Sequence, residues 1–473
     1  MWARHAVPCP SLTLSMTWPA GCVTTYSTER SRVTGTGTDP GREKRMDETS
    51  TPSIGSPRTS FRMQRERRGA GLLPGFHPAR LPRHLLALLC GLVLACGEAP
   101  STTTDAAPRA DYTEVAAALE AMIERERDQK GLAAMSIALV DEEGVAWAAG
   151  FGEQSAGHPA TPATVYRVGS VSKLFTDIAV MQLHERGELD IDAPVTDYLP
   201  DFAPDNPSGT PITLRQLMSH RAGLIREPPV GNYFDDSGAD LAATIASLSG
   251  TPQIYPPEAR VKYSNAGIAV VGYALEVTQG EPFADYVKRA VLAPIGMDNS
   301  AFAPEPDVID DLADAYMWGI DRPDYDAPTF ELGMAPAGSM YSTVLDLARF
   351  IEVMFRHGEL EGAAGSLLTP ETLEAMWQPQ FADPSATTGF GLGFSVQERF
   401  GERWLGHGGA IYGFSTQLAF MPESRLGVVV VSAVDITNTV TGRISDVALE
   451  LMRAARAGEP LPPADNSPAT SDP

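Results

Sequence analysis

The stretch Val168 to Phe175, VGSVSKLF, decides how the chain is interpreted, because it sets a serine and a lysine three residues apart. The two residues stand at the head of a pattern that predicts a helix over 170–186, which stops at Gly187. Residues three apart lie on one face of a helix, with Cβ atoms about 5–6 Å apart. The Lys173 amine can therefore reach the Ser170 hydroxyl.

A hydroxyl and an amine in one helical turn can form a nucleophile and its base. A serine attacks poorly until a neighbouring group takes its proton, and a lysine can do so when burial lowers its pKa. A helix N-terminus also offers free backbone N–H groups that stabilise developing negative charge. The alternative is a serine cap beside a solvated lysine. Four apolar residues favour burial, because they give the helix a broad apolar face: Leu174, Phe175, Ile178 and Met181.

A second candidate, Tyr263-Ser264-Asn265, precedes an apolar run that predicts a core helix ending at Gly280. A tyrosine and an asparagine two residues apart at the start of a helix can both face a cleft. The phenol of Tyr263 can shuttle a proton, and the amide of Asn265 can hold a substrate amide. Taken alone, the pair is more typical of a packing aromatic and an asparagine cap.

A third candidate, His407-Gly408-Gly409-Ala410, lies between residues typical of strands. Two adjacent glycines in a strand indicate the close approach of another backbone or of a ligand. A backbone N–H group of such a strand can help to bind an oxyanion. Taken alone, the four residues are more typical of a β-turn.

The chain between 111 and 456 predicts one α+β domain. Tyr112 to Lys130 is a helical pattern closed by Gly131, and 190–320 holds helical patterns cut by proline-rich loops. The remaining segments predict a hairpin, three strands and a last helix: 132–140 with 145–150, then 403–405, 416–421 and 426–434, then 445–455. We therefore expect an antiparallel β-sheet built from both ends of the chain, flanked by the N- and C-terminal helices, with an inserted all-helical subdomain.

Charge is spread unevenly over the 473 residues, whose formal net charge is −24. Residues 1–95 carry a net +7, from 13 Lys and Arg against 6 Asp and Glu, so the remainder carries −31. A body this acidic repels nucleic acid, and we expect no nucleic-acid partner.

The four cysteines, Cys9, Cys22, Cys90 and Cys96, precede this body, which can therefore hold no internal disulfide.

An apolar run of eleven residues, Leu85 to Ala95, follows two arginines and leads directly into Cys96. It is too short to cross a bilayer as a helix, and charge before an apolar run is the plan of a secretory signal. Its end, VLAC, resembles a bacterial lipobox, in which the chain is cut before a cysteine that becomes lipidated. We expect 63–95 to be a lipoprotein signal peptide and Cys96 the lipidated residue. A buried apolar strand is the alternative.

This interpretation extends to both ends of the chain. Residues 1–62 show no hydrophobic period, so we expect them to be disordered, or untranslated with a start at Met63. Residues 96–110 and 457–473 are polar and proline-rich, and we expect a flexible tether and a disordered tail. The protein would then lie on the periplasmic face of a bacterial cell envelope, touching the membrane only through a lipid at Cys96.

The three candidate motifs occur in the order of a known family. S-x-x-K at Ser170, Y-x-N at Tyr263 and H-G-G at His407 resemble the marks of the serine β-lactamase and penicillin-binding protein superfamily. The resemblance is closest to class C β-lactamases, D-alanyl-D-alanine peptidases and related esterases. It covers roughly 130–440 and extends to three longer stretches: Val165 to Leu199, Ile212 to Leu224 and Pro336 to Phe350.

The resemblance implies a role for each candidate residue. Ser170 would attack a carbonyl and become acylated, while Lys173 and Tyr263 move the proton. Asn265 would position the substrate amide, and the N–H groups of Ser170 and Ala410 would form an oxyanion hole, with about 10²–10³ in rate per donor. Water would then release the acyl group of a small-molecule or peptide substrate, with no metal or organic cofactor.

Two positions depart from the β-lactamase pattern. His407 stands where β-lactamases carry a lysine that attracts a substrate carboxylate, and Gly408 stands where they carry a hydroxyl that binds it. Relatives that act on esters or small peptides often show His-Gly-Gly. We therefore expect a serine hydrolase for esters, small amides or D-peptides. A β-lactamase or D-alanyl-D-alanine carboxypeptidase is one alternative, and an inactive penicillin-sensing protein is another.

Three further segments bear on the site. His220, in MSHRAGL, is expected to be structural, as a cap on helix carbonyls. Gly389 to Gly393, GFGLG, is expected to form a bend that leads into a strand near the site. We expect loops such as Arg226 to Ser237 to shape the acyl pocket.

Overall fold

The computed structural model describes residues 16–17, 23–24, 109–319, 323–362 and 365–463. They belong to two units, divided between Ala99 and Pro100. In the first unit, β1 (Met16–Thr17) and β2 (Val23–Thr24) form a short antiparallel ladder. All other described helices and strands belong to the second unit.

Several predicted segments lie outside the described residues. These are the signal peptide at 63–95, Cys96, almost all of 1–62, most of the tether and the end of the tail from 464. Within the described part of the chain, no helix combines the length and the apolar character needed to cross a membrane.

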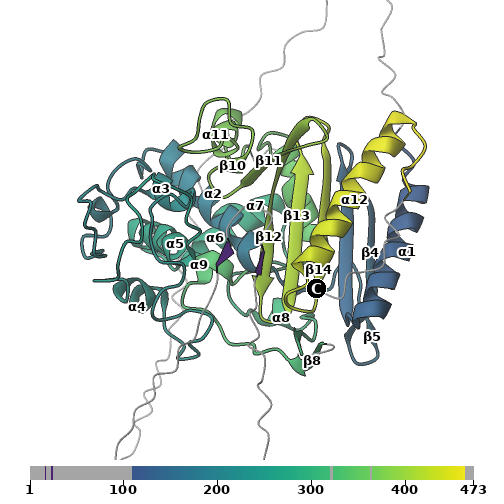
Figure 1. The fold of residues 1–473 in the computed structure, drawn as a ribbon, viewed down its shortest axis with the longest axis horizontal. Coiled ribbons are helices and arrows are strands. Elements are labelled where there is room, and N and C mark those ends of the chain that lie inside the picture. The colour runs from purple at the N-terminus through teal and green to yellow at the C-terminus, as the bar shows by residue number, and fades with distance from the viewer. Residues whose placement is uncertain (1–15, 18–22, 25–108, 320–322, 363–364, 464–473) are drawn as a thin grey trace, which may run out of the picture. The chain divides into compact units, whose positions relative to one another are not determined.

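Eight strands form one antiparallel sheet (Figure 1). Across the sheet their order is β10 (Gly389–Phe390), β11 (Ser395–Arg399), β12 (Glu402–Ile411), β13 (Phe414–Met421), β14 (Leu426–Ser432), β3 (Ala134–Asp141), β4 (Gly144–Ser155) and β5 (His158–Pro159). The pairing of β14 with β3 joins the C-terminal strands to the N-terminal hairpin. The predicted sheet built from both ends of the chain is therefore confirmed.

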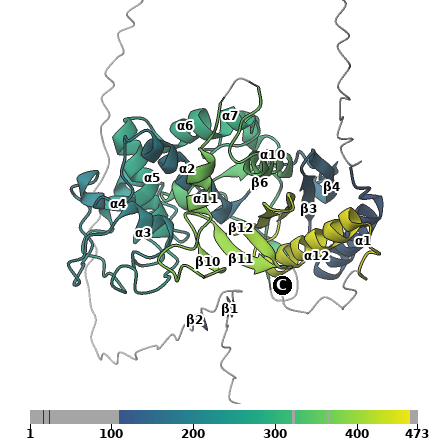
Figure 2. The ribbon, with the colours of Figure 1, turned by 90° about the horizontal axis from the view of Figure 1, so that it is seen from above.

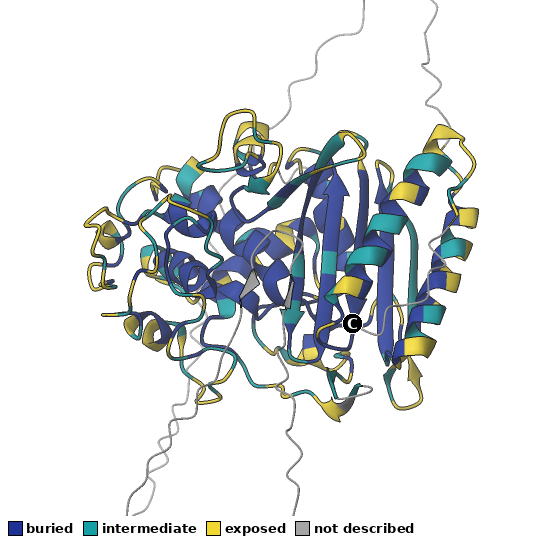
Figure 3. Ribbon diagram, viewed as in Figure 1, coloured by how far each residue is buried: buried dark blue, intermediate teal, exposed yellow. Residues whose placement is uncertain are grey.

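The two faces of the sheet bury different side chains, because successive residues of a strand point to opposite faces. In β3, Ile137 and Leu139 join the core under the terminal helices, whereas Ala138 and Val140 join the core of the helical part. The helices α1 (Thr113–Lys130) and α12 (Asn438–Ala457) cover the first face (Figures 1 and 2). All of β3 and β14 is buried as a result, as the dark blue strands of Figure 3 show.

On the opposite face, α10 (Val344–Phe355) packs against β3 and β14. The other helices are α2 (Ser172–Glu185), α3 (Leu214–Met218), α4 (Leu241–Ala246), α5 (Asn265–Gln279), α6 (Phe283–Val287), α7 (Ala293–Ile295), α8 (Pro306–Ile309), α9 (Ala335–Gly338) and α11 (Pro370–Met376). Single turns are η1 (Gly169–Val171), η2 (Val195–Asp197) and η3 (Lys288–Leu292).

Two short ladders accompany these helices. They are β6 (Tyr166–Arg167) with β9 (Tyr341–Ser342), and β7 (Tyr316–Trp318) with β8 (Pro323–Asp326). The inserted part of the chain is therefore mainly helical, with short extended segments where it returns to the sheet.

The helix predicted over 170–186 begins later than expected. It starts at Ser172, and Ser170 lies in the preceding 3₁₀ turn η1. Gly169 has φ of +53°, a left-handed conformation that turns the chain sharply between β6 and α2. The helix after Tyr263 ends as predicted, with Gly280 as a left-handed C-cap.

Candidate active site

Ser170 and Lys173 lie side by side where η1 passes into α2. The Lys173 Nζ atom donates to Ser170 Oγ at 3.0 Å and to the Ala337 carbonyl oxygen at 2.6 Å. The lysine is completely buried, and Ser170 is 9% exposed. The amine is therefore held between the serine hydroxyl and the backbone of α9.

Burial changes the proton affinity of this amine. Removal from water lowers the pKa of Lys173 to about 7, against an ordinary value of 10.5. The Arg226 charge lowers it further, whereas Glu227 and Asp177 oppose the shift. Near neutral pH a large fraction of the molecules therefore carries a neutral amine beside Ser170.

Tyr263 completes this group from the start of α5. Ser264 has an extended backbone and caps the helix by accepting from the Gly267 N–H, so Tyr263 stands just before the cap. Burial raises the pKa of the Tyr263 phenol, and the nearby Ser170 side chain partly offsets this rise. Lys173 Nζ lies 5.0 Å from the centre of the Tyr263 ring. The Tyr263 ring thus lies beside both members of the serine–lysine pair.

The backbone of strand β12 lies directly against the backbone of the turn that carries Ser170. A Cβ atom at Gly409 would lie 2.0 Å from the Val168 carbonyl oxygen, and one at Gly169 would lie 2.7 Å from the Ala410 nitrogen. Only glycine at both positions permits this approach, as the adjacent glycines predicted. The Ala410 backbone therefore lies beside the turn that carries Ser170.

His407 and Gly408 lie on the same strand. His407 is buried, and its Nδ1 donates to the Gly408 carbonyl oxygen at 2.6 Å. Burial and the nearby Lys173 charge lower the pKa of His407 to about 3, so the ring is neutral at physiological pH. At Gly408 a Cβ atom would meet nothing nearer than Gln417 Oε1 at 3.4 Å, so the strand leaves room for a side chain there.

Asn265 is engaged by a residue that sequence analysis missed. Its Nδ2 donates to both carboxylate oxygens of Glu227, at 2.8 and 3.0 Å, and its buried Oδ1 has no partner among the described residues. Arg226 Nε lies 3.1 Å from Glu227, and its guanidinium lies 5.0 Å from the centre of the Tyr263 ring. The only sequence signal for this pair of charges was its place in a loop expected to line the pocket.

His220 does not cap helix carbonyls as predicted. Its ring packs on Tyr263 with centres 4.2 Å apart and meets Phe390 edge-on at 5.2 Å. Its Nδ1 lies 3.4 Å from the Ser264 N–H, and burial lowers its pKa well below the ordinary value. A neutral ring can accept a hydrogen bond from this N–H. His220 therefore packs against Tyr263 and helps to hold its position. Phe390 belongs to β10 and contacts the His220 and Tyr263 rings, so the glycine-rich segment lies at the site as predicted.

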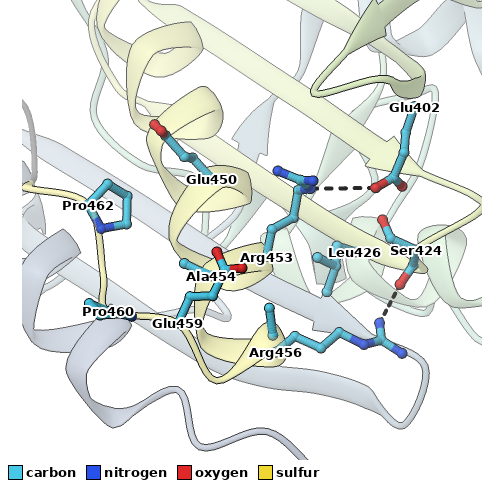
Figure 4. A pocket seen from close by; sticks show the side chains of 11 residues that line it. Glu402, Ser424, Leu426, Glu450, Arg453, Ala454, Arg456, Glu459, Pro460 and Pro462 are labelled. Atoms are coloured by element: carbon cyan, nitrogen blue, oxygen red, sulfur yellow. Dashed lines mark hydrogen bonds and ion pairs between the residues drawn. The ribbon is translucent and has the colours of Figure 1, made fainter.

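A surface groove of about 500 Å³ lies elsewhere, where α12 ends beside the β13–β14 turn (Figure 4). Two of its charged side chains have partners at the groove: Arg453 lies 3.5 Å from Glu402, and Arg456 donates to the Ser424 carbonyl oxygen. None of the predicted site residues lines this groove. The three motifs instead meet around Ser170, where the Tyr263 and His407 rings are 6.1 Å apart.

The fold and the site together define the class of protein, a serine hydrolase. The chain belongs to the beta-lactamase family, whose model, described as Beta-lactamase, matches residues 119–451. Penicillin-binding protein 4 of Amycolatopsis lactamdurans is 28% identical over 69% of this chain and 86% of its own. Esterase EstB of Burkholderia gladioli is 29% identical over 60% of this chain and 79% of the esterase.

A solved structure has a similar fold. D-amino acid amidase from Ochrobactrum anthropi matches with a TM-score of 0.61 and 22% identity, over 73% of this chain and 100% of the amidase. At this identity the match concerns the fold. The predicted family, fold class and enzyme class are confirmed by the family match and these similar proteins.

Proposed function

We propose that the protein forms an acyl-enzyme on Ser170 and hydrolyses esters, small amides or D-peptides. The observation that carries this proposal is the buried contact of 3.0 Å between Lys173 Nζ and Ser170 Oγ. Because the pKa of Lys173 is lowered to about 7, a neutral amine is available to accept the hydroxyl proton.

Acylation would begin when Ser170 Oγ attacks the substrate carbonyl carbon and its proton passes to Lys173 Nζ. The N–H groups of Ser170 and Ala410 would hold the resulting oxyanion. As the tetrahedral adduct collapses, the bond to the leaving group breaks. Tyr263 would relay the proton from Lys173 to the departing oxygen or nitrogen. Deacylation would repeat these steps with water as the nucleophile and return Ser170 to its starting state.

The charges around the site support a substrate that lacks a carboxylate. His407 is neutral, with a pKa of about 3, and offers no positive charge to such a group. The Glu227 carboxylate beside Asn265 would repel it, and the neighbouring Arg226 is already paired with Glu227. An esterase and an amidase also stand among the similar proteins. Esters and small amides therefore fit better than β-lactams or D-alanyl-D-alanine peptides.

Active-site labelling tests the proposal. The purified protein would be treated separately with a fluorophosphonate and with a fluorescent penicillin, and the modified peptide would be mapped. We expect fluorophosphonate on Ser170 and turnover of p-nitrophenyl acetate, both absent in Ser170→Ala and both retained in a variant of an exposed serine, Ser385→Ala. Labelling by penicillin alone would favour a peptidase or a sensor. Turnover by Ser170→Ala would overturn the acyl-enzyme.

We also propose that the protein is anchored in a bacterial envelope by a lipid on Cys96. The support is the sequence alone, an apolar run from Leu85 to Ala95 followed directly by the cysteine. Mass spectrometry of the native protein should find Cys96 as the lipidated first residue, and Cys96→Ser should release the protein from the membrane fraction. Peptides from 1–62 in the native protein would contradict the expected start at Met63.

A further inference from the structure

The loop after Glu227 brings an aromatic side chain against the serine turn. A Cβ atom at Gly338 would lie 3.5 Å from the Tyr233 hydroxyl oxygen and 4.0 Å from the carbonyl carbon of Gly169, the residue before Ser170. Gly338 follows Ala337, whose carbonyl oxygen accepts from Lys173. The Tyr233 hydroxyl therefore borders the turn that carries the nucleophile.

Tyr233 is one of three aromatic side chains that meet here from separate segments. The Tyr412 ring lies edge-on to Tyr233 at 6.1 Å, and the Phe330 ring lies 5.8 Å from Tyr412. All three residues are half-buried, and Tyr233 and Phe330 pack against the core of the helical part. Edge-on and tilted pairs at these distances are favourable arrangements of aromatic rings.

Tyr233, Phe330 and Tyr412 together form what we call the aromatic wall. Hydrogen bonds to main-chain oxygens connect it with the elements around Ser170. Tyr412 follows Ala410 by two residues, and its hydroxyl donates to the Tyr233 carbonyl oxygen. The Phe330 carbonyl oxygen accepts from Arg167 at 3.3 Å, and Arg167 is a buried residue three positions before Ser170. The wall is thus fixed relative to both the nucleophile turn and the β12 edge.

We propose that Tyr233, Phe330 and Tyr412 bind the acyl group of the substrate and select esters or amides whose acyl group carries an aromatic ring. This proposal rests on the proposed function, because the acyl group is the part of the substrate that becomes attached to Ser170. An aromatic acyl group can add a further edge-on pair to the wall and bury its own apolar surface against it. A methyl group, as in an acetyl ester, can do neither.

The test compares two esters with the same leaving group, p-nitrophenyl phenylacetate and p-nitrophenyl acetate. In the wild-type protein we expect the higher kcat/KM for phenylacetate. Tyr233→Ala and Tyr412→Leu should each lower the phenylacetate-to-acetate ratio about three- to tenfold, the range that one aromatic pair supplies. The matched control is Phe234→Ala, which removes a neighbouring aromatic ring that is 89% exposed, and it should leave the ratio unchanged.

A second variant tests the wall without removing any of its members. Gly338→Ala places a methyl group at ordinary contact distance from the Tyr233 hydroxyl, so the fold should tolerate it. It narrows the space beside the wall and should reduce phenylacetate turnover more than acetate turnover. Circular dichroism melting curves would show that each variant is folded.

The outcomes separate this proposal from the proposed function. If the protein hydrolyses acetate through Ser170 but the ratio is the same in wild type, Tyr233→Ala, Tyr412→Leu and Gly338→Ala, the aromatic wall is overturned and the acyl-enzyme stands. An equal fall of the ratio in Phe234→Ala would also overturn it. If neither ester is hydrolysed and Ser170 is not labelled, the proposed function fails, and the wall with it.

Discussion

The turn that carries Ser170 and the loop beside it are built from different kinds of contact. From Val168 to Asp177 every residue of the turn is buried. Backbone atoms set its position, because Gly169 and Gly409 let it touch β12 directly and the Ala337 carbonyl oxygen holds Lys173. A substitution in this region is therefore expected to move Ser170.

The loop 225–237 is mostly half-buried or exposed, and its own side chains hold it. Asn232 Nδ2 donates to the Pro228 carbonyl oxygen at 2.8 Å, and the Asp235 carboxylate accepts from the Gly231 N–H at 2.7 Å. Such contacts can be replaced one at a time. We therefore expect the reaction to depend on the turn, and substrate choice to depend on the charges and side chains of a loop whose contacts can be replaced separately.

The largest expected effect comes from removing the amine of the turn. Lys173→Met keeps the length of a buried side chain but no base, so kcat/KM for p-nitrophenyl acetate should fall about 10²–10⁴-fold. The control is Lys288→Met, which changes a lysine that is 52% exposed and paired with Glu305. Activity of Lys173→Met within tenfold of wild type would show that the turn does not supply the base.

The same variant separates catalysis from stability. Between a pKa of about 7 in the folded protein and the ordinary 10.5, the unfolded chain holds a proton on Lys173 that the folded chain has lost. Stability of the wild type should therefore rise with pH in this window, and this contribution is absent from Lys173→Met. We expect the inactive variant to melt at a higher temperature at pH 7, by a margin that narrows toward pH 10. A constant margin would contradict the lowered pKa.

The next effect should come from the two adjacent glycines of β12. Gly409→Ala forces a methyl group against the Val168 carbonyl oxygen, at 2.0 Å, where only backbone can give way. We expect a loss of about 1–3 kcal/mol in stability and of up to about 10²–10³ in rate, because Ala410 is displaced from the turn. Gly408→Ala is the matched control, and both its melting temperature and its activity should be close to wild type. If Gly408→Ala and Gly409→Ala lost the same stability and activity, the contact of Gly409 with the Val168 backbone would not explain the loss.

This pair of glycines also shows what the sequence could predict. A glycine pair between strand-like residues indicated a close approach, and the apolar runs 132–140 and 426–434 indicated strands, because both signals are local in the sequence. The start of α2 was misplaced, since the left-handed Gly169 turns the chain just before it and leaves Ser170 in a 3₁₀ turn.

Contacts made by loops did not follow from the sequence. Asn265 and Glu227 are 38 residues apart, and Lys173 and Ala337 are 164 residues apart, with no period that links them. His220 was expected at a helix end and was found there, but its ring turns toward Tyr263 because the loop before α5 returns to it. Such contacts depend on the path of whole loops, which propensity and periodicity do not encode.

A smaller effect connects the loop to the turn through charge. The Glu227 charge raises the pKa of Lys173, and the Arg226 charge lowers it. Since the neutral amine would be the active form in the proposed mechanism, kcat/KM should rise with pH through the pKa of Lys173. Glu227→Gln should move this acid limb to lower pH, and Arg226→Gln should move it to higher pH. Shifts in the same direction, measured with p-nitrophenyl acetate, would show that the loop does not act on the turn through charge.

The smallest expected effect tests whether selectivity can be changed at the β12 edge while the turn stays intact. His407→Lys with Gly408→Thr restores the charge and the hydroxyl that favour a substrate carboxylate. The threonine has room, because the Gly408 Cβ position is 3.4 Å from the flexible Gln417 side chain. We expect nitrocefin turnover to rise roughly fivefold, which corresponds to about 1 kcal/mol of added interaction. The measurement is the ratio of nitrocefin to p-nitrophenyl acetate turnover, because acetate lacks the carboxylate.

Glu227→Gln should raise this ratio too, since it removes a repulsive charge from the other side of the site. If both variants leave the ratio unchanged, charge around the site does not set the substrate, and selectivity must come from the shape of the acyl pocket.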